Sequence, residues 1–150
     1  MGEPGMSSSV FNSVYETSLR LVLLLSAFEE PLTSEELFAF DFVSTYGKEF
    51  GLTDVSLNGD SEFTMSKATL RRKRVMESIS YLVRNGYAAP VAVEDVVRYE
   101  LLEKGEKLYK KIYSTGYAEK YILTVELGKN GLFSKNESAL NLILEKIKEG

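Results

Sequence analysis

The residues best suited to chemistry are four consecutive cations, Arg71-Arg72-Lys73-Arg74. Residues 66–86 hold six basic residues and one acidic residue, although the whole chain of 150 residues has a formal net charge of −4. A positive field concentrated on an otherwise acidic or neutral chain is typical of a surface that meets an anion. That anion is either a nucleic acid or an acidic partner protein.

These cations fall within an expected helix over about residues 67–85, which the Asn85-Gly86 pair ends. Helical spacing puts Lys67, Arg71, Arg74 and Ser78 on one face, opposite an apolar stripe. We therefore expect the cations to be exposed. Three interpretations stay open: they contact DNA, they contact a protein, or they form a solvated face. The candidate partner-binding or DNA-binding residues are Lys67, Arg71, Arg72, Lys73 and Arg74.

Residues for catalysis or metal binding are missing from the sequence. The chain has no His and no Cys, which removes the usual zinc sites and histidine acid–base catalysis. It has no glycine-rich phosphate-binding motif, and the spacing of Asp54, Asp60 and Glu62 fits no familiar oxygen-ligand loop. We expect no enzyme, catalytic site, cofactor or metal. Asp41, on the apolar side of an expected helix, is interpreted as a boundary carboxylate bonded to a neighbouring group.

The elements that position the basic block are three helices followed by a hairpin. Helices are expected over about 14–28, 34–46 and 67–85, and Thr33 with Glu36 forms a capping box before the second. Ser66 or Thr64 is the expected cap of the third. Alternating apolar residues then predict a β-hairpin over 87–102, with Glu94-Asp95 as its turn.

This order predicts a mainly α fold with a small β-hairpin, a winged helix-turn-helix with additional C-terminal helices. Those helices are expected over about 103–114, 117–127 and 137–148. Residues 1–9 are predicted to be a flexible arm, 10–102 the winged-helix core, and 103–150 a helical extension of the same domain. The long loop over 47–65 has no assigned role.

Two features favour a protein partner over DNA. The predicted wing tip is Glu94-Asp95, and acidic residues there are repelled by phosphate. The run Leu21–Leu25 makes the first helix apolar on most of its sides, and the helix over 137–148 has an apolar stripe of its own. We expect another chain to cover one of these two surfaces. The run is too short to span a bilayer, and the chain lacks cysteine, so we expect a cytoplasmic protein without a membrane contact.

Four stretches of the chain can be compared with known families. They are a leucine-rich helix (18–25), an aromatic and acidic helix (37–42), a basic helix with its glycine turn (70–75 and 85–87) and a strand with its turn (98–105). Together they resemble the middle component of the bacterial ABC-three-component systems, which overlap the Lamassu-type anti-phage defence operons. The resemblance covers about residues 14–128, and the chain departs from the family at Ser56-Leu57-Asn58, where a His-Pro-containing segment is expected.

The resemblance implies a non-catalytic accessory or regulatory subunit that bridges an ATPase of the structural-maintenance-of-chromosomes (SMC) type and a nuclease-type effector. Non-specific DNA contact within that complex is compatible with the basic helix. Two alternatives stay open: a winged-helix transcription regulator that binds operator DNA as a homodimer, and a dimeric structural protein.

Overall fold

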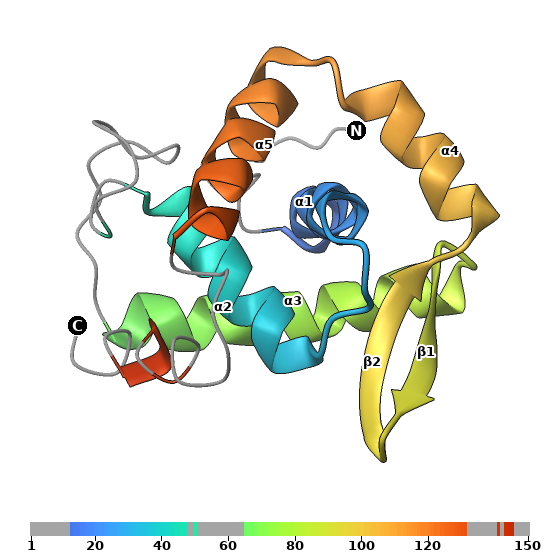
Figure 1. Ribbon diagram of the computed structural model, residues 1–150, viewed down its shortest axis with the longest axis horizontal. Coiled ribbons are helices and arrows are strands. Elements are labelled where there is room, and N and C mark those ends of the chain that lie inside the picture. Colours follow the sequence, from blue (N-terminus) through green and yellow to red (C-terminus); the bar gives the residue numbers. More distant parts are fainter. Residues whose placement is uncertain (1–12, 48–49, 51–64, 132–140, 142, 146–150) are drawn as a thin grey trace.

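A computed structural model describes residues 13–47, 50, 65–131, 141 and 143–145 (Figure 1). The described part of the chain is mostly helical with one small antiparallel hairpin, as predicted. The expected arm over 1–9, most of the loop over 47–65 and most of the helix over 137–148 lie outside these residues. Within that last helix, Asn141 and residues 143–145 are helical. In chain order, the elements are α1 (Val14–Ala27), α2 (Ser34–Thr45), α3 (Met65–Arg84), β1 (Ala88–Val93), β2 (Val96–Leu101), α4 (Glu103–Ile112) and α5 (Gly116–Lys129).

Helix α1 lies at the centre of the fold, with α2 and α3 on one side and α4 and α5 arching over the other (Figure 1). The side chains of Leu21–Leu25 are therefore buried by the chain itself, at most 7% exposed. Of the two surfaces expected to be covered by another chain, this run is instead covered by the chain itself, and the seam over 137–148 lies mostly outside the described residues. The physical reason is that the segment after residue 102 folds back onto the face of α1 that α2 and α3 leave open.

Local signals set the helix ends. The Ser13 hydroxyl caps α1 by accepting from the Glu16 amide, 3.1 Å away. The capping box between Thr33 and Glu36 starts α2 as predicted. Ser66 is not a cap, because α3 already begins at Met65, and Thr64 lies outside the described residues.

A turn at Gly86 leads from α3 into the hairpin. Gly86 has φ +79°, a left-handed conformation that glycine adopts without strain. The hairpin turns at Glu94 and Asp95, whose φ values of 53° and 69° are those of a type I′ turn. Leu32, between α1 and α2, pairs with Tyr99 of β2 through two backbone hydrogen bonds of 3.1 and 2.8 Å. The hairpin is thereby tied to the start of the helical core.

Two pairs of stacked tyrosines lie on α4, at its end and on α5. Tyr109 stacks on Tyr113 and Tyr117 stacks on Tyr121, with ring centroids 5.4 and 6.4 Å apart. The helix ends between the pairs, so the four rings do not form one continuous stripe. Tyr121 is fully buried, whereas Tyr113 is 46% exposed. In the part that the structure describes, no helix is both long and apolar enough to cross a membrane.

Candidate functional site

Arg71, the first residue of the basic block, is buried rather than exposed. Its side chain is 3% exposed, and its Nη1 donates a 2.8 Å hydrogen bond to Thr45 Oγ1. The guanidinium also lies 5.7 Å from the centroid of the Tyr46 ring. Ser78, on the same predicted face, is buried as well and donates to the Val14 carbonyl. The prediction that this face of the helix is exposed is therefore wrong at these two positions, because α1 and α2 together cover more of α3 than the apolar stripe alone.

Arg71 belongs to a polar core cluster made of Arg20, Asp41, Arg71 and Tyr121, one residue from each of α1, α2, α3 and α5. Asp41 accepts from Arg20 Nε at 2.8 Å and from the Tyr121 hydroxyl at 2.7 Å. Arg71 Nη1 lies 3.5 Å from Asp41 Oδ2. Asp41 is bonded to side chains, as expected, but it is fully buried and not at a boundary. A single carboxylate thus fixes four helices to one another.

Charge–charge interactions in the polar core cluster favour an ionised Asp41 and a neutral Tyr121. Burial tends to raise the pKa of Asp41, but the charges of Arg20 and then Arg71 outweigh it and leave that pKa below its ordinary value. Burial and, as the second cause, the negative charge of Asp41 raise the pKa of Tyr121 well above 10.0. The Tyr121 hydroxyl therefore keeps its proton and donates it to the hydrogen bond with Asp41. Burial and the charge of Arg20 lower the pKa of Arg71. All four side chains are at most 3% exposed, and their bonds join helices to one another, which fits a structural role.

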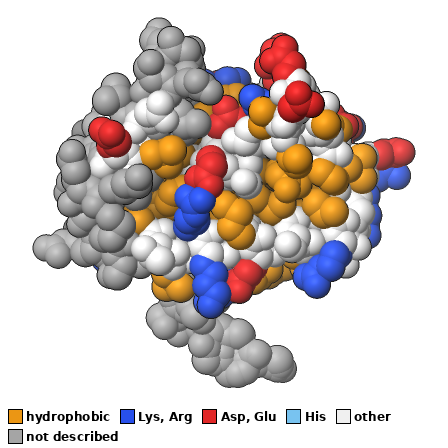
Figure 2. All heavy atoms as spheres, turned by 90° about the horizontal axis from the view of Figure 1, so that it is seen from below, with side chains coloured by type: hydrophobic (Ala, Val, Ile, Leu, Met, Phe, Trp, Pro, Cys, Tyr) orange, Lys and Arg blue, Asp and Glu red, His pale blue; other side chains and the backbone are white. Residues whose placement is uncertain are grey.

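The exposed part of the basic block is smaller than the sequence predicts. Arg72 pairs with both carboxylate oxygens of Glu35 and lies over the Phe38 ring. Arg74 pairs with Glu77 at 3.0 Å. Lys73 is exposed and Lys67 is half-buried. On the face in Figure 2, Lys and Arg side chains stand apart from one another beside acidic and apolar surface.

The hairpin carries an exposed apolar surface that the sequence interpretation missed. Val93, Val96 and Val97 are 39%, 43% and 55% exposed, next to the acidic turn of Glu94 and Asp95. Val93 lies directly opposite Val96 in the strand register. Exposed β-branched residues beside a charged turn suit contact with a protein surface. The signal was present in the sequence, as three valines that flank the turn.

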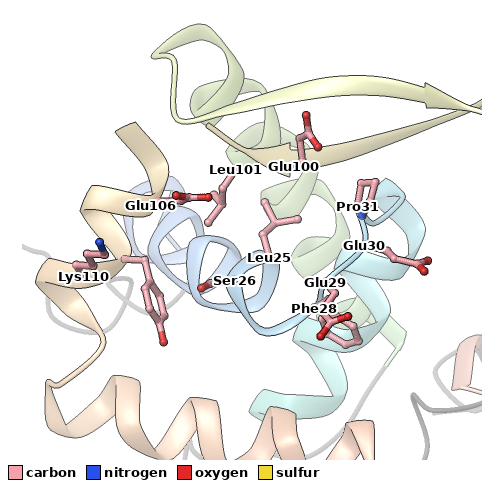
Figure 3. A pocket seen from close by; sticks show the side chains of 11 residues that line it. Leu25, Ser26, Phe28, Glu29, Glu30, Pro31, Glu100, Leu101, Glu106 and Lys110 are labelled. Carbon is pink, nitrogen blue, oxygen red and sulfur yellow. The ribbon is translucent and has the colours of Figure 1, made fainter. Parts of the chain in front are cut away.

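The chain also forms a pocket that sequence patterns did not indicate. It has a volume of about 390 Å³ and lies between the end of α1, strand β2 and helix α4 (Figure 3). Glu29 and Glu30, interpreted only as the break after the first helix, form part of its wall. In the described ranges, no group of three or more His, Cys, Asp or Glu side chains is placed to hold a metal ion.

A comparison with family models finds one family that the chain matches over most of its length. The model described as "ABC-three component (ABC-3C) system Middle Component 2" matches residues 10–149. No curated protein and no solved structure matched the chain.

Proposed function

The chain belongs to the family of middle component 2 of the ABC-three-component systems, and from this premise we propose that it bridges an SMC-type ABC ATPase and a nuclease-type effector. Membership indicates an accessory subunit of a defence system. Bridging, the identity of both partners and a Lamassu-type anti-phage role are the proposed part. We propose further that the subunit is non-catalytic and works in the cytoplasm.

A winged-helix arrangement is part of this proposal. Helices α1, α2 and α3 precede the hairpin, and Leu32 pairs with Tyr99 on the outer side of β2. Pairing between a residue of the segment that joins the first two helices and the outer strand of the hairpin is compatible with a winged helix-turn-helix, and this supports the proposal. Arg71 is buried in the polar core cluster, so the third helix would meet a partner only through its remaining exposed side chains.

The observation that carries a protein-binding role is the exposed surface of the hairpin. Val93, Val96 and Val97 are exposed β-branched side chains, whereas the turn beside them is acidic. Phosphate repels such a turn, but a protein groove lined by apolar residues and a basic edge accepts it. We therefore place one docking surface at the hairpin valines.

Co-expression with the two other components of the same system tests the proposal. Tagged wild-type protein should retain both of them through purification. Val97→Asp should weaken retention of one component by about tenfold, because it puts a charge into an apolar contact. Leu123→Asp on α5 is the matched control, since Leu123 is 60% exposed and Val97 is 55% exposed.

Two outcomes count against the proposal. Wild-type protein that retains neither component excludes a bridging role. Equal loss of binding in Val97→Asp and Leu123→Asp excludes the hairpin as the specific docking surface. A phage-plating assay of the same variants tests whether complex formation and protection fall together.

A homodimeric DNA-binding regulator is the second candidate function. The exposed cations Lys73 and Arg84 on α3 favour it, because the third helix of such proteins enters the major groove. The pairing of Arg72 with Glu35 and of Arg74 with Glu77 counts against it, because each pair leaves less positive charge for phosphate. A gene neighbourhood with a long coiled-coil ATPase would favour the defence subunit.

A further inference from the structure

The pocket between α1, β2 and α4 has an apolar floor and an acidic rim. Leu25, Phe28, Leu101 and Tyr109 line it with buried or half-buried apolar surface. We call this site the acid-rimmed pocket, and Figure 3 shows the residues that line it at the end of α1, on β2 and on α4. Its rim carries the carboxylates of Glu29, Glu30, Glu100 and Glu106 and the ammonium group of Lys110.

Several contacts hold the walls of the acid-rimmed pocket in place before anything binds. Phe28 stacks on Phe40 with a centroid distance of 5.4 Å, and Lys129 Nζ lies 5.2 Å from the Phe28 centroid. Arg98 Nη1 donates to the Pro31 carbonyl at 3.2 Å. A site that is already formed loses little conformational entropy when it binds a partner.

The charges around the opening are unbalanced. Its rim holds four carboxylates and one ammonium group, and all five side chains are exposed. Within the described part of the chain none of Glu29, Glu30, Glu100 and Glu106 forms an ion pair, whereas several other glutamates do. A cation at this opening would relieve the repulsion between the carboxylates, and an anion would be excluded.

We infer that the acid-rimmed pocket binds a segment of a partner subunit that presents a lysine or arginine next to an apolar side chain. The apolar side chain contacts Phe28, Leu101 and Tyr109, and the cation lies among the carboxylates. The volume of about 390 Å³ falls in the range of pockets that hold small groups, so it fits a few side chains and not a folded domain. The inference rests on the proposed function, since it takes the partner to be another component of the same system.

The test is co-purification of the tagged chain with the other two components after co-expression. Glu30→Lys combined with Glu106→Lys reverses one charge on each side of the opening. We expect about tenfold weaker retention of one component, because cation–carboxylate contacts turn into repulsion. Glu119→Lys with Glu145→Lys is the matched control, because it makes the same change in net charge at exposed positions away from the pocket.

A second variant guards against a folding defect, since Glu106 lies in the first turn of α4. Glu30→Gln with Glu106→Gln removes the charges at nearly constant size and should weaken retention in the same direction. The bound segment is identified with a photo-crosslinking residue, p-benzoylphenylalanine, in place of the exposed Ser26 at the pocket edge. The crosslinked peptide should come from a partner and contain Lys or Arg beside an apolar residue.

The outcomes separate this inference from the proposed function. Wild-type protein that retains neither component overturns both. Full retention by both pocket variants overturns only the acid-rimmed pocket as a docking site. A crosslink to nucleic acid, to an acidic peptide or to a segment of this same chain also overturns it.

Discussion

Asp41 stabilises the fold by holding two guanidinium groups in a site closed to solvent. Arg20 bonds to it at 2.8 Å and Arg71 lies 3.5 Å away, so two positive charges share one carboxylate. Removal of one partner from a buried ion pair leaves an uncompensated charge, which costs far more than the loss of an exposed pair. The polar core cluster is therefore where single substitutions should act most strongly on stability.

The first prediction concerns the charge of Asp41. Asp41→Asn should lower the free energy of unfolding by about 3–5 kcal/mol, because Arg20 and Arg71 lose their counter-charge. Urea denaturation followed by circular dichroism measures the change. Glu77→Gln, which breaks a partly exposed pair with Arg74, should change the free energy of unfolding by less than about 1 kcal/mol. Similar effects of the two substitutions would contradict the buried network.

The second prediction concerns pH. The pKa of Asp41 is lower in the folded state than its ordinary value of 3.8. Its charge therefore stabilises the fold fully above about pH 4, and this stabilisation is lost as the pH falls through the folded-state pKa. The free energy of unfolding of wild-type protein should decline more steeply on acidification than that of Asp41→Asn. Parallel curves from pH 6 to pH 2 would exclude the ionised carboxylate as the cause.

The third prediction separates the cations of the basic block. Arg71→Glu should prevent stable folding, because it places a second buried carboxylate beside Asp41. Arg74→Glu should leave the fold intact, since Arg74 is 32% exposed. Thermal unfolding of both variants measures this directly. A cooperative transition at the wild-type temperature in Arg71→Glu would show that the residue is not buried in solution.

At the scale of elements, close packing of α4 against the hairpin shapes the acid-rimmed pocket. Gly105 on α4 lies so near the hairpin that an added Cβ would be 2.3 Å from the Tyr87 carbonyl oxygen and 2.8 Å from Leu101 Cδ2. Such distances leave no room for a side chain. The position of α4, and with it that of Glu106 and Tyr109, depends on this glycine.

The fourth prediction tests that contact. Gly105→Ala should lower the free energy of unfolding by about 1–3 kcal/mol, because the methyl group forces α4 away from the hairpin. Gly116→Ala is the control, since nothing lies within 4 Å of its added Cβ and alanine should raise stability by about 0.4–1 kcal/mol. A destabilisation in both variants would mean that the loss of glycine, and not the contact, is responsible.

At the scale of the whole molecule, charge is arranged by tertiary pairing more than by sequence blocks. The chain has 18 basic and 22 acidic residues. One arginine of the basic block is buried and two pair with glutamates, so Lys73 and Arg84 are the exposed cations of α3 that form no ion pair among the described residues. The acid-rimmed pocket and the acidic turn of the hairpin lie on other elements. This distribution favours protein partners over nucleic acid.

The fifth prediction follows for DNA. The isolated protein should bind duplex DNA with a dissociation constant on the order of 10⁻⁶ to 10⁻⁴ M at physiological salt, without sequence preference. Lys73→Ala should weaken binding to all sequences alike, and fluorescence anisotropy at several salt concentrations measures both effects. A nanomolar specific site that is lost in Lys73→Ala would favour the transcription regulator.

The sequence by itself determined those helices and strands whose ends and turns depend on residues close together in the chain. The capping box of Thr33 and Glu36 and the glycine at 86 act within a few residues, so the predicted ends of α2 and α3 lie close to the observed ones. The hairpin followed from the alternation of apolar residues around Glu94-Asp95, and its strands and turn are confirmed. The resemblance carried by short stretches also predicted a middle component of an ABC-three-component system, which the comparison confirms, whereas its Lamassu-type part stays a prediction.

Only the tertiary structure decided which side chains are exposed. A helical wheel shows the directions of Arg71 and Ser78 but not the elements that pack there, and α1 and α2 cover both. The three partners of Asp41 are separated from it in the sequence by 21, 30 and 80 positions. The acid-rimmed pocket likewise brings residues 25–31 next to residues 100–110. Burial depends on contacts between segments that are distant in sequence. Local periodicity therefore predicts where a helix lies in the chain, but not which of its faces pack against other elements.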